Sequence, residues 1–165
     1  MTESSVRRIK KAIAQLPVPD PWDRRRFVEG VAEMRGRPIT LLPVGMRGGL
    51  ASPCGLWLVR EHDDVIIYED ATSEYHMDQI VCHEIGHMVL GHDRAQSSDT
   101  GVTSDPMFRS VFPDIDPLTV RTVLGRSDYG NALEREAEMF ATMVMVSGGR
   151  GQRDQNFRNV LFKRQ

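Results

Sequence analysis

The 165-residue sequence contains no apolar run that approaches the roughly 18 residues needed to cross a membrane. Its first 20 residues also lack the apolar core of a secretory signal peptide. Only two cysteines occur, Cys54 and Cys82, and without an export signal they are most simply reduced thiols. We therefore expect a cytoplasmic protein that has neither a membrane span nor a disulfide framework.

The rest of the composition is that of an ordinary globular chain. Hydrophobic residues make up 40% and charged residues 27%, without repeats, so we expect one folded domain over residues 1–149. The formal net charge of −2 gives no reason to expect a nucleic-acid partner. Basic residues outnumber acidic ones in residues 1–37 and in the polar tail 150–165. These basic ends are either solvated surface or docking faces for an acidic partner.

Hydrophobic periodicity and turn signals predict an α+β fold. In the second predicted helix, Pro21 suits the first turn and Gly36 suits the C-terminal cap. The predicted helices cover residues 4–16, 20–36, 72–91, 116–125 and 131–149. The predicted strands cover residues 38–44, 55–61 and 64–70. We expect N-terminal helices within residues 1–37, followed by a three-stranded, mainly antiparallel sheet and two longer helices.

The helix over 72–91 carries an H-E-x-x-H motif. His83 and His87 are four residues apart, so both imidazoles lie on one helix face and can bind one metal ion. Glu84 is turned by about 100° from His83, where it can hold a metal-bound water and take its proton. This arrangement is typical of zinc peptidases. The alternative is an ordinary core helix with two hydrogen-bonded histidines, because so short a motif also occurs by chance.

A catalytic zinc requires a third protein ligand. An H-E-x-x-H-x-x-G-x-x-H site is disfavoured, because Leu90 stands at the glycine position and Asp93 at the last ligand position. Gly91 and His92 are each one residue out of register. We therefore expect the third ligand to come from a separate helix rather than from His92 or Asp93.

The helix over 131–149 offers three glutamates as candidates. Glu134 and Glu136 border its apolar stripe on opposite sides, so a carboxylate at the edge of the stripe can reach the metal. Glu138 lies one turn after Glu134 and can accept a hydrogen bond from the second ring nitrogen of a ligand histidine. All three glutamates also fit a solvated, charged helix face. The stripe consists of Leu133, Ala137, Phe140, Ala141 and Val144.

The stretches TSEYHMDQIVCHEIGHMVLGH and EREAEMFAT together resemble the ImmA/IrrE family of metallopeptidases. They look most like the short bacterial members that are encoded beside a helix-turn-helix regulator. The resemblance implies a small zincin-like domain of the gluzincin style. In it, His83 and His87 are zinc ligands, Glu84 is the general base and Glu134 is the third ligand.

The sequence departs from that family in two places. Glu138 stands where the family pattern E-x-x-A-D/N-x-F-A has Asp or Asn, and MVMVSGG replaces the LLMP-like end of the helix. Two further residues have two interpretations each. Tyr129 is either a hydrogen-bond donor to the oxyanion of a tetrahedral intermediate or a structural tyrosine. His76 is a cap or surface residue or lines the cleft, and Cys82 is expected to fill the core.

These observations predict a zinc-dependent endopeptidase that cleaves a specific regulatory protein by means of metal-activated water. The resemblance implies that the substrate is a separately encoded transcriptional regulator, since this chain has no recognisable helix-turn-helix of its own. The strand over 55–60 is expected to pair with the extended substrate. The alternative is a zinc-stabilised, non-hydrolytic binding protein, or a toxin-like partner of such a regulator. A hydrolase for a non-peptide substrate is a weaker possibility.

Overall fold

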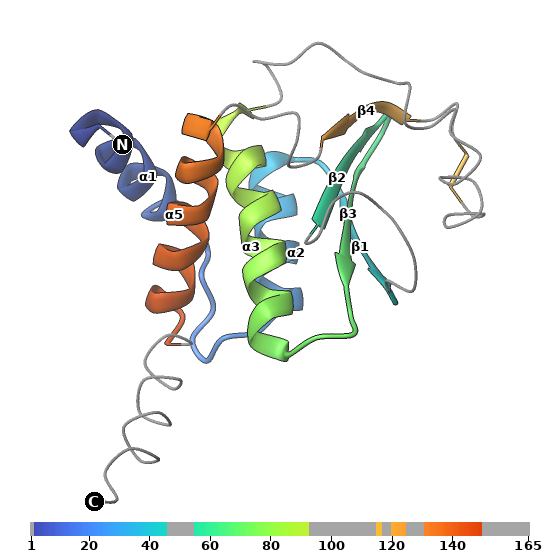
Figure 1. Ribbon diagram of the computed structural model, residues 1–165, viewed down its shortest axis with the longest axis horizontal. Helices are drawn as coiled ribbons and strands as arrows, with labels where there is room; N and C mark the ends of the chain where they lie inside the picture. Colours follow the sequence, from blue (N-terminus) through green and yellow to red (C-terminus); the bar gives the residue numbers. More distant parts are fainter. Residues whose placement is uncertain (1, 46–54, 93–114, 117–119, 125–130, 150–165) are drawn as a thin grey trace, which may run out of the picture.

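Within the described residues, the chain forms four helices and one four-stranded sheet, which confirms the α+β class (Figure 1). In the computed structural model, the described residues are 2–45, 55–92, 115–116, 120–124 and 131–149. The basic tail that was expected over 150–165 lies outside these residues. No helix in the described part of the chain is both long and apolar enough to span a membrane.

Helix α1 spans Glu3–Ile13 and covers one side of the helical layer. The Thr2 hydroxyl caps it by accepting a hydrogen bond from the Ser5 N–H at 3.2 Å. Ile9 is fully buried and belongs to the main apolar cluster. The amphipathic helix predicted for this region is therefore confirmed.

Helix α2 spans Arg24–Arg35. The Asp23 carboxylate accepts a hydrogen bond from the Arg26 N–H at 2.9 Å and so fixes the start of the helix. Pro21 consequently lies before the helix, and the prediction that it occupies the first turn is wrong. Gly36 ends α2 in the left-handed conformation, with φ of 63°, which confirms the predicted cap.

The sheet has the strand order β1-β3-β2-β4. β1 pairs with β3 in parallel, whereas β2 pairs with both β3 and β4 in antiparallel fashion. The three predicted strands are confirmed, and the sheet is mainly antiparallel as expected. The strands span Ile39–Val44 (β1), Gly55–Arg60 (β2), Asp64–Glu69 (β3) and Val120–Leu124 (β4).

Strand β4 corrects the prediction of a short helix over 116–125 and of a sheet with only three strands. The stretch is rich in β-branched residues, among them Val120, Thr122 and Val123, which fit a pleated surface. Antiparallel pairing with β2 satisfies its backbone hydrogen-bonding groups along one side. Pairing with β2 therefore stabilises a strand where local periodicity predicted a helix.

Strand β3 is buried on both faces of the sheet. Ile66 and Tyr68 belong to the main apolar cluster, together with residues of the helices. Val65 and Ile67 alternate with them and form a second cluster with Leu58 on the opposite face. The sheet therefore gives α3 a rigid support.

Helix α3, Glu74–Leu90, lies between the sheet and α5 (Figure 1). The Ser73 hydroxyl caps its start by accepting from the His76 N–H, and Gly91 ends it with φ of 69°. Both ends agree with the predicted range 72–91. The apolar face of α3 is buried as expected, with Val81, Ile85 and Met88 in the core.

Helix α5, Asn131–Ser147, packs closely against α3. A side chain at Gly86 of α3 would place its Cβ 3.3 Å from the Cα atom of Ala137 and 3.0 Å from Phe140 Cδ1. Only a glycine facing a small residue allows the two helices to approach this closely. The predicted apolar stripe of α5 is confirmed, with Ala137, Phe140, Ala141 and Val144 buried and Leu133 partly buried.

Helix α2 is tied to the core by arginines that pair with buried aspartates. Arg24 Nε donates to Asp78 Oδ1 on α3 at 2.7 Å. At the start of β3, Asp64 is fully buried and its Oδ2 lies 2.6 Å from Arg35 Nη1 and 3.2 Å from Arg37 Nε. These pairs fix the position of α2 against both the sheet and α3.

Candidate metal centre

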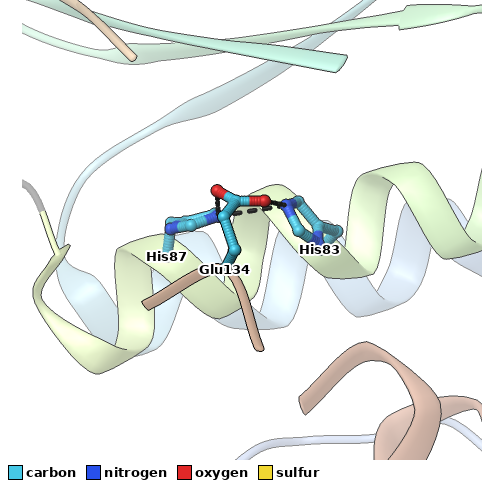
Figure 2. A group of neighbouring side chains, drawn as sticks. All are labelled: His83, His87 and Glu134. Atoms are coloured by element: carbon cyan, nitrogen blue, oxygen red, sulfur yellow. Dashed lines mark hydrogen bonds and ion pairs between the residues drawn. The ribbon is translucent and has the colours of Figure 1, made fainter. Parts of the chain in front are cut away.

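Three side chains from two helices converge at one point (Figure 2). The Nε2 atoms of His83 and His87, one turn apart on α3, are 3.0 Å from each other. Glu134, in the first turn of α5, places Oε2 3.5 Å from His83 Nε2 and Oε1 3.4 Å from His87 Nε2. One ligand atom from each residue lies within 4.8 Å of the other two, so the group can hold a metal ion.

The close contact between α3 and α5 explains why these side chains meet. Gly86 lies directly before His87 in the motif and faces Ala137, which is three residues after Glu134. Because one helical turn separates Glu134 from this contact, its carboxylate extends over the paired imidazoles. The structure thus brings together His83, His87 and Glu134, and of the two glutamates considered from the sequence it is the Glu134 carboxylate that lies beside both histidines.

His87 is held in the neutral form that metal binding requires. Its side chain is 1% exposed, and burial together with the neighbouring His83 and His92 lowers its pKa from 6.5 to about 2. A neutral imidazole presents an unprotonated nitrogen lone pair at neutral pH. His87 therefore needs to lose no proton before it can act as a ligand.

Glu84 follows His83 on α3 and is almost fully buried, with 4% of its surface exposed. Its carboxylate packs against the first residue of β2, since a Cβ added to Gly55 would lie 2.8 Å from Glu84 Oε1. A glycine at this position leaves room for the carboxylate between α3 and the sheet. The fold thus buries the Glu84 carboxylate between α3 and the start of β2, where Gly55 has no side chain to displace it.

His92 is not a member of the ligand group, in agreement with its disfavoured register. Instead its Nδ1 lies 2.9 Å from His87 Nδ1, on the side of the His87 ring opposite to Nε2. The left-handed turn at Gly91 ends α3 and directs the next residue back toward the helix. A histidine just after a glycine cap was the available signal for this contact, whereas the ligand spacing alone considers His92 only as a metal ligand.

Glu136 is turned away from the ligand group and contacts His92 instead. It is 8% exposed, its Oε2 lies 3.3 Å from His92 Nε2, and Arg8 Nη2 of α1 donates to the same oxygen. Burial alone would raise the pKa of Glu136, but hydrogen bonds from Ser5, Arg8 and His92 and the Arg8 charge lower it overall. Glu136 is therefore an ionised acceptor between α1 and His92.

Other candidates from the sequence have different positions. Glu138 is exposed, and the group that contacts the second ring nitrogen of His87 is the His92 ring, whose other nitrogen contacts Glu136. His76 lies in the first turn of α3, and Cys82 is a buried free thiol, as expected. Tyr129 and Asp93 lie outside the described residues.

The expectation that β2 pairs with a substrate needs correction. β2 is an interior strand, paired with β3 on one side and, from Trp57 to Arg60, with β4 on the other. Its backbone donors and acceptors along that stretch are already used within the sheet. Among the described strands, the edge of the sheet next to β2 is β4.

Comparisons of the chain with protein-family models, with curated proteins and with solved structures find no match. The likeness to the ImmA/IrrE metallopeptidases therefore rests on the two motifs quoted above.

Proposed function

We propose that this protein is a zinc-dependent peptidase in which His83, His87 and Glu134 hold the metal. The observation that carries the proposal is the spacing of the three ligand atoms. Zinc bonds of about 2.0–2.2 Å in a tetrahedron separate neighbouring ligand atoms by roughly 3.3–3.6 Å. In the structure, the two separations between Glu134 and the histidines are 3.4 and 3.5 Å, within this range, and the histidine nitrogens lie slightly closer to each other, at 3.0 Å. Two imidazoles and one carboxylate also form a known catalytic zinc set that leaves a fourth position open.

In this proposal, Glu84 is the general base. Bound zinc would supply Lewis-acid chemistry, polarising a peptide carbonyl and making a water more acidic. Glu84 follows a ligand histidine directly and is buried, so a proton passed to its carboxylate is shielded from bulk solvent. A zinc that served only to clamp α3 to α5 would need no carboxylate in that position. The presence of Glu84 therefore favours hydrolysis over a purely structural zinc.

For the substrate we propose an extended segment of a separately encoded transcriptional regulator, as the resemblance to ImmA/IrrE peptidases implies. The edge strand β4 is a better place for backbone pairing than the interior strand β2. Leu124, at the end of β4, pairs with Trp57, which is only two residues from Gly55 and its contact with Glu84. A peptide added at this edge would lie two strand spacings, roughly 10 Å, from β2.

The test is co-expression of the full-length protein with the tagged product of the adjacent gene. Wild type is compared with Glu84→Gln, and zinc content is measured on each purified protein. Glu138→Gln serves as the matched control, because it makes the same chemical change on an exposed position of α5. Cleavage should occur with wild type and with Glu138→Gln but stop with Glu84→Gln, while all three proteins retain zinc.

Two results would count against a peptidase. If the partner disappears equally with Glu84→Gln, Glu84 is not the base for its removal. If no version cuts the partner but all bind both it and zinc, the non-hydrolytic binding protein becomes the better description. Because zinc content is measured separately, neither result is confused with failure of the metal site itself.

A further inference from the structure

A continuous series of side-chain contacts runs from the metal centre to the N-terminal helix. It begins at Nδ1 of His87, passes through both ring nitrogens of His92, and ends at Glu136 Oε2, which accepts from Arg8 on α1. The four residues come from α3, the turn after it, α5 and α1. Glu136 and Arg8 are 128 residues apart in the sequence, so only the fold brings them together.

The direction of each hydrogen bond follows from metal binding. A ligand histidine bound through Nε2 carries its proton on Nδ1, so Nδ1 of His87 donates to Nδ1 of His92 at 2.9 Å. His92 must then carry its own proton on Nε2, which donates to Glu136 Oε2 at 3.3 Å. The ionised Glu136 is the acceptor that makes this tautomer of His92 favourable. Every nitrogen in the series therefore has one defined role.

We propose that His92, Glu136 and Arg8 are positioning residues that hold His87 in its metal-binding orientation and couple metal affinity to the docking of α1 on α5. The inference rests on the metal site of the proposed function, but not on the peptidase reaction. Outer hydrogen-bond partners of this kind fix the ring orientation and raise the basicity of a ligand histidine.

The connection to α1 is specific to one face of that helix. Arg8 donates a hydrogen bond to Glu136, and Ile9 beside it is buried in the core. Arg7, the preceding residue, points to solvent, and among the described residues it pairs with exposed Glu3 at 3.2 Å. Displacing α1 would therefore remove a cation from Glu136 and weaken its hold on His92.

The experiment measures zinc affinity of the full-length chain by competition with a chromophoric chelator. The visible spectrum of the Co²⁺-loaded protein reports the ligand geometry. His92→Leu and Glu136→Gln should each lower zinc affinity about 10–100-fold and alter the Co²⁺ spectrum. Arg8→Met should lower zinc affinity by up to about fivefold, because its side chain is half exposed, and Arg8→Lys should recover part of the loss.

Two matched controls separate positioning from general damage. Arg7→Met removes a neighbouring arginine of α1, and Glu138→Gln neutralises a neighbouring glutamate of α5. Both should bind zinc as wild type does. His92 is buried, so melting of each metal-free variant is followed as well. Glu136→Gln is nearly isosteric and Arg8 is half exposed, so these two variants keep the test valid if His92→Leu does not fold.

The graded loss from His92 and Glu136 to Arg8 would support the positioning series. If Glu136→Gln binds zinc as tightly as Glu138→Gln, the series is overturned. If Arg8→Met binds zinc as tightly as Arg7→Met, the coupling of zinc affinity to α1 is overturned. A protein that shows the graded loss but cuts no partner would refute the peptidase and keep this inference. A protein that cuts its partner while all variants bind zinc equally would refute this inference and keep the peptidase.

Discussion

Asp64 and Glu136 are both buried carboxylates that pair with arginines of the N-terminal segment. Asp64 pairs with Arg35 and Arg37, whose guanidinium groups hold α2 against the sheet. Glu136 pairs with Arg8, which holds α1 against α5. By residue type and burial, the two carboxylates are alike. They differ in what else they contact.

Within the described residues, the side-chain partners of Asp64 are the guanidinium groups of Arg35 and Arg37, which compensate its negative charge, and the contacts end there. Glu136 has a third kind of partner, the His92 ring, whose other nitrogen meets His87. A buried ion pair is therefore structural or functional according to where its remaining hydrogen bonds lead. Substitutions at the two positions should separate stability from metal binding.

The largest effect on stability is expected from Asp64→Ala. It removes the carboxylate that holds two arginines between α2 and β3, so the free energy of unfolding should fall by about 3 kcal/mol. Urea unfolding measures this loss, and Asp63→Ala, which breaks a partly exposed pair with Arg60, should cost less than about 1 kcal/mol. Zinc affinity should be unchanged in both variants. A clear loss of zinc affinity in Asp64→Ala would end the distinction between the two carboxylates.

The largest effect on the metal should come from Glu134→Ala. Removing a direct ligand should lower zinc affinity by more than the roughly 100-fold that loss of an outer partner can cost. Competition with a chelator measures the change, and Glu138→Ala on the exposed side of α5 is the matched control. The metal-free variant should unfold at nearly the wild-type temperature, because the Glu134 side chain is partly exposed. Undiminished zinc binding would show that the three residues are not the metal site.

A smaller effect on both properties is expected from Gly86→Val. The added Cβ would meet Phe140 and the backbone of Ala137, and such overpacking costs about 1–3 kcal/mol. The displaced α5 carries Glu134 with it, so zinc affinity should fall in parallel. Gln79→Val, earlier on α3 and outside this contact, controls for the effect of a β-branched residue in the helix. Equal stability of the two variants would mean that the helix contact does not position Glu134.

The sequence predicts those features of the fold and site that depend on local patterns. The capping residues Ser73 and Gly91 delimit α3, and the four-residue spacing places His83 and His87 on one face. Glu134 was favoured over Glu136 only through the family pattern, because both border the apolar stripe. Their separate roles depend on which neighbouring helix each side of α5 meets.

Contacts between distant segments explain the features that were missed or wrong. Strand β4 was expected as a helix because its partner β2 is not adjacent in the sequence. The contact of His92 with Glu136 spans 44 residues and depends on the backbone turn after α3. The Arg8 contact joins opposite ends of the described chain. Periodicity within one helix carries no information about such pairs.

A gradual effect is expected in the response of the metal-free protein to mild acid. His87 titrates near 6.5 in the unfolded chain, whereas its folded pKa is lowered to about 2, and burial also lowers the pKa of His92. Below pH 6.5 the unfolded chain therefore binds protons that the folded protein excludes, so folding stability must fall as pH falls. His87 alone contributes a loss of about 1.4 kcal/mol per pH unit in this range.

This response is measured by urea unfolding of the chelator-treated protein between pH 7 and pH 5, before acidic groups such as Glu136 titrate. The other titratable or charged groups near the His87 and His92 rings, which are those of His83, Glu134 and Arg8, are present in every variant compared. His87→Gln should flatten the dependence, whereas His62→Gln, at an exposed turn, should retain it. An equal slope in His87→Gln would show that His87 is not kept neutral by the fold. The metal-binding form of His87 would then have to be generated by the metal itself, rather than by the buried environment that α3, α5 and His92 create.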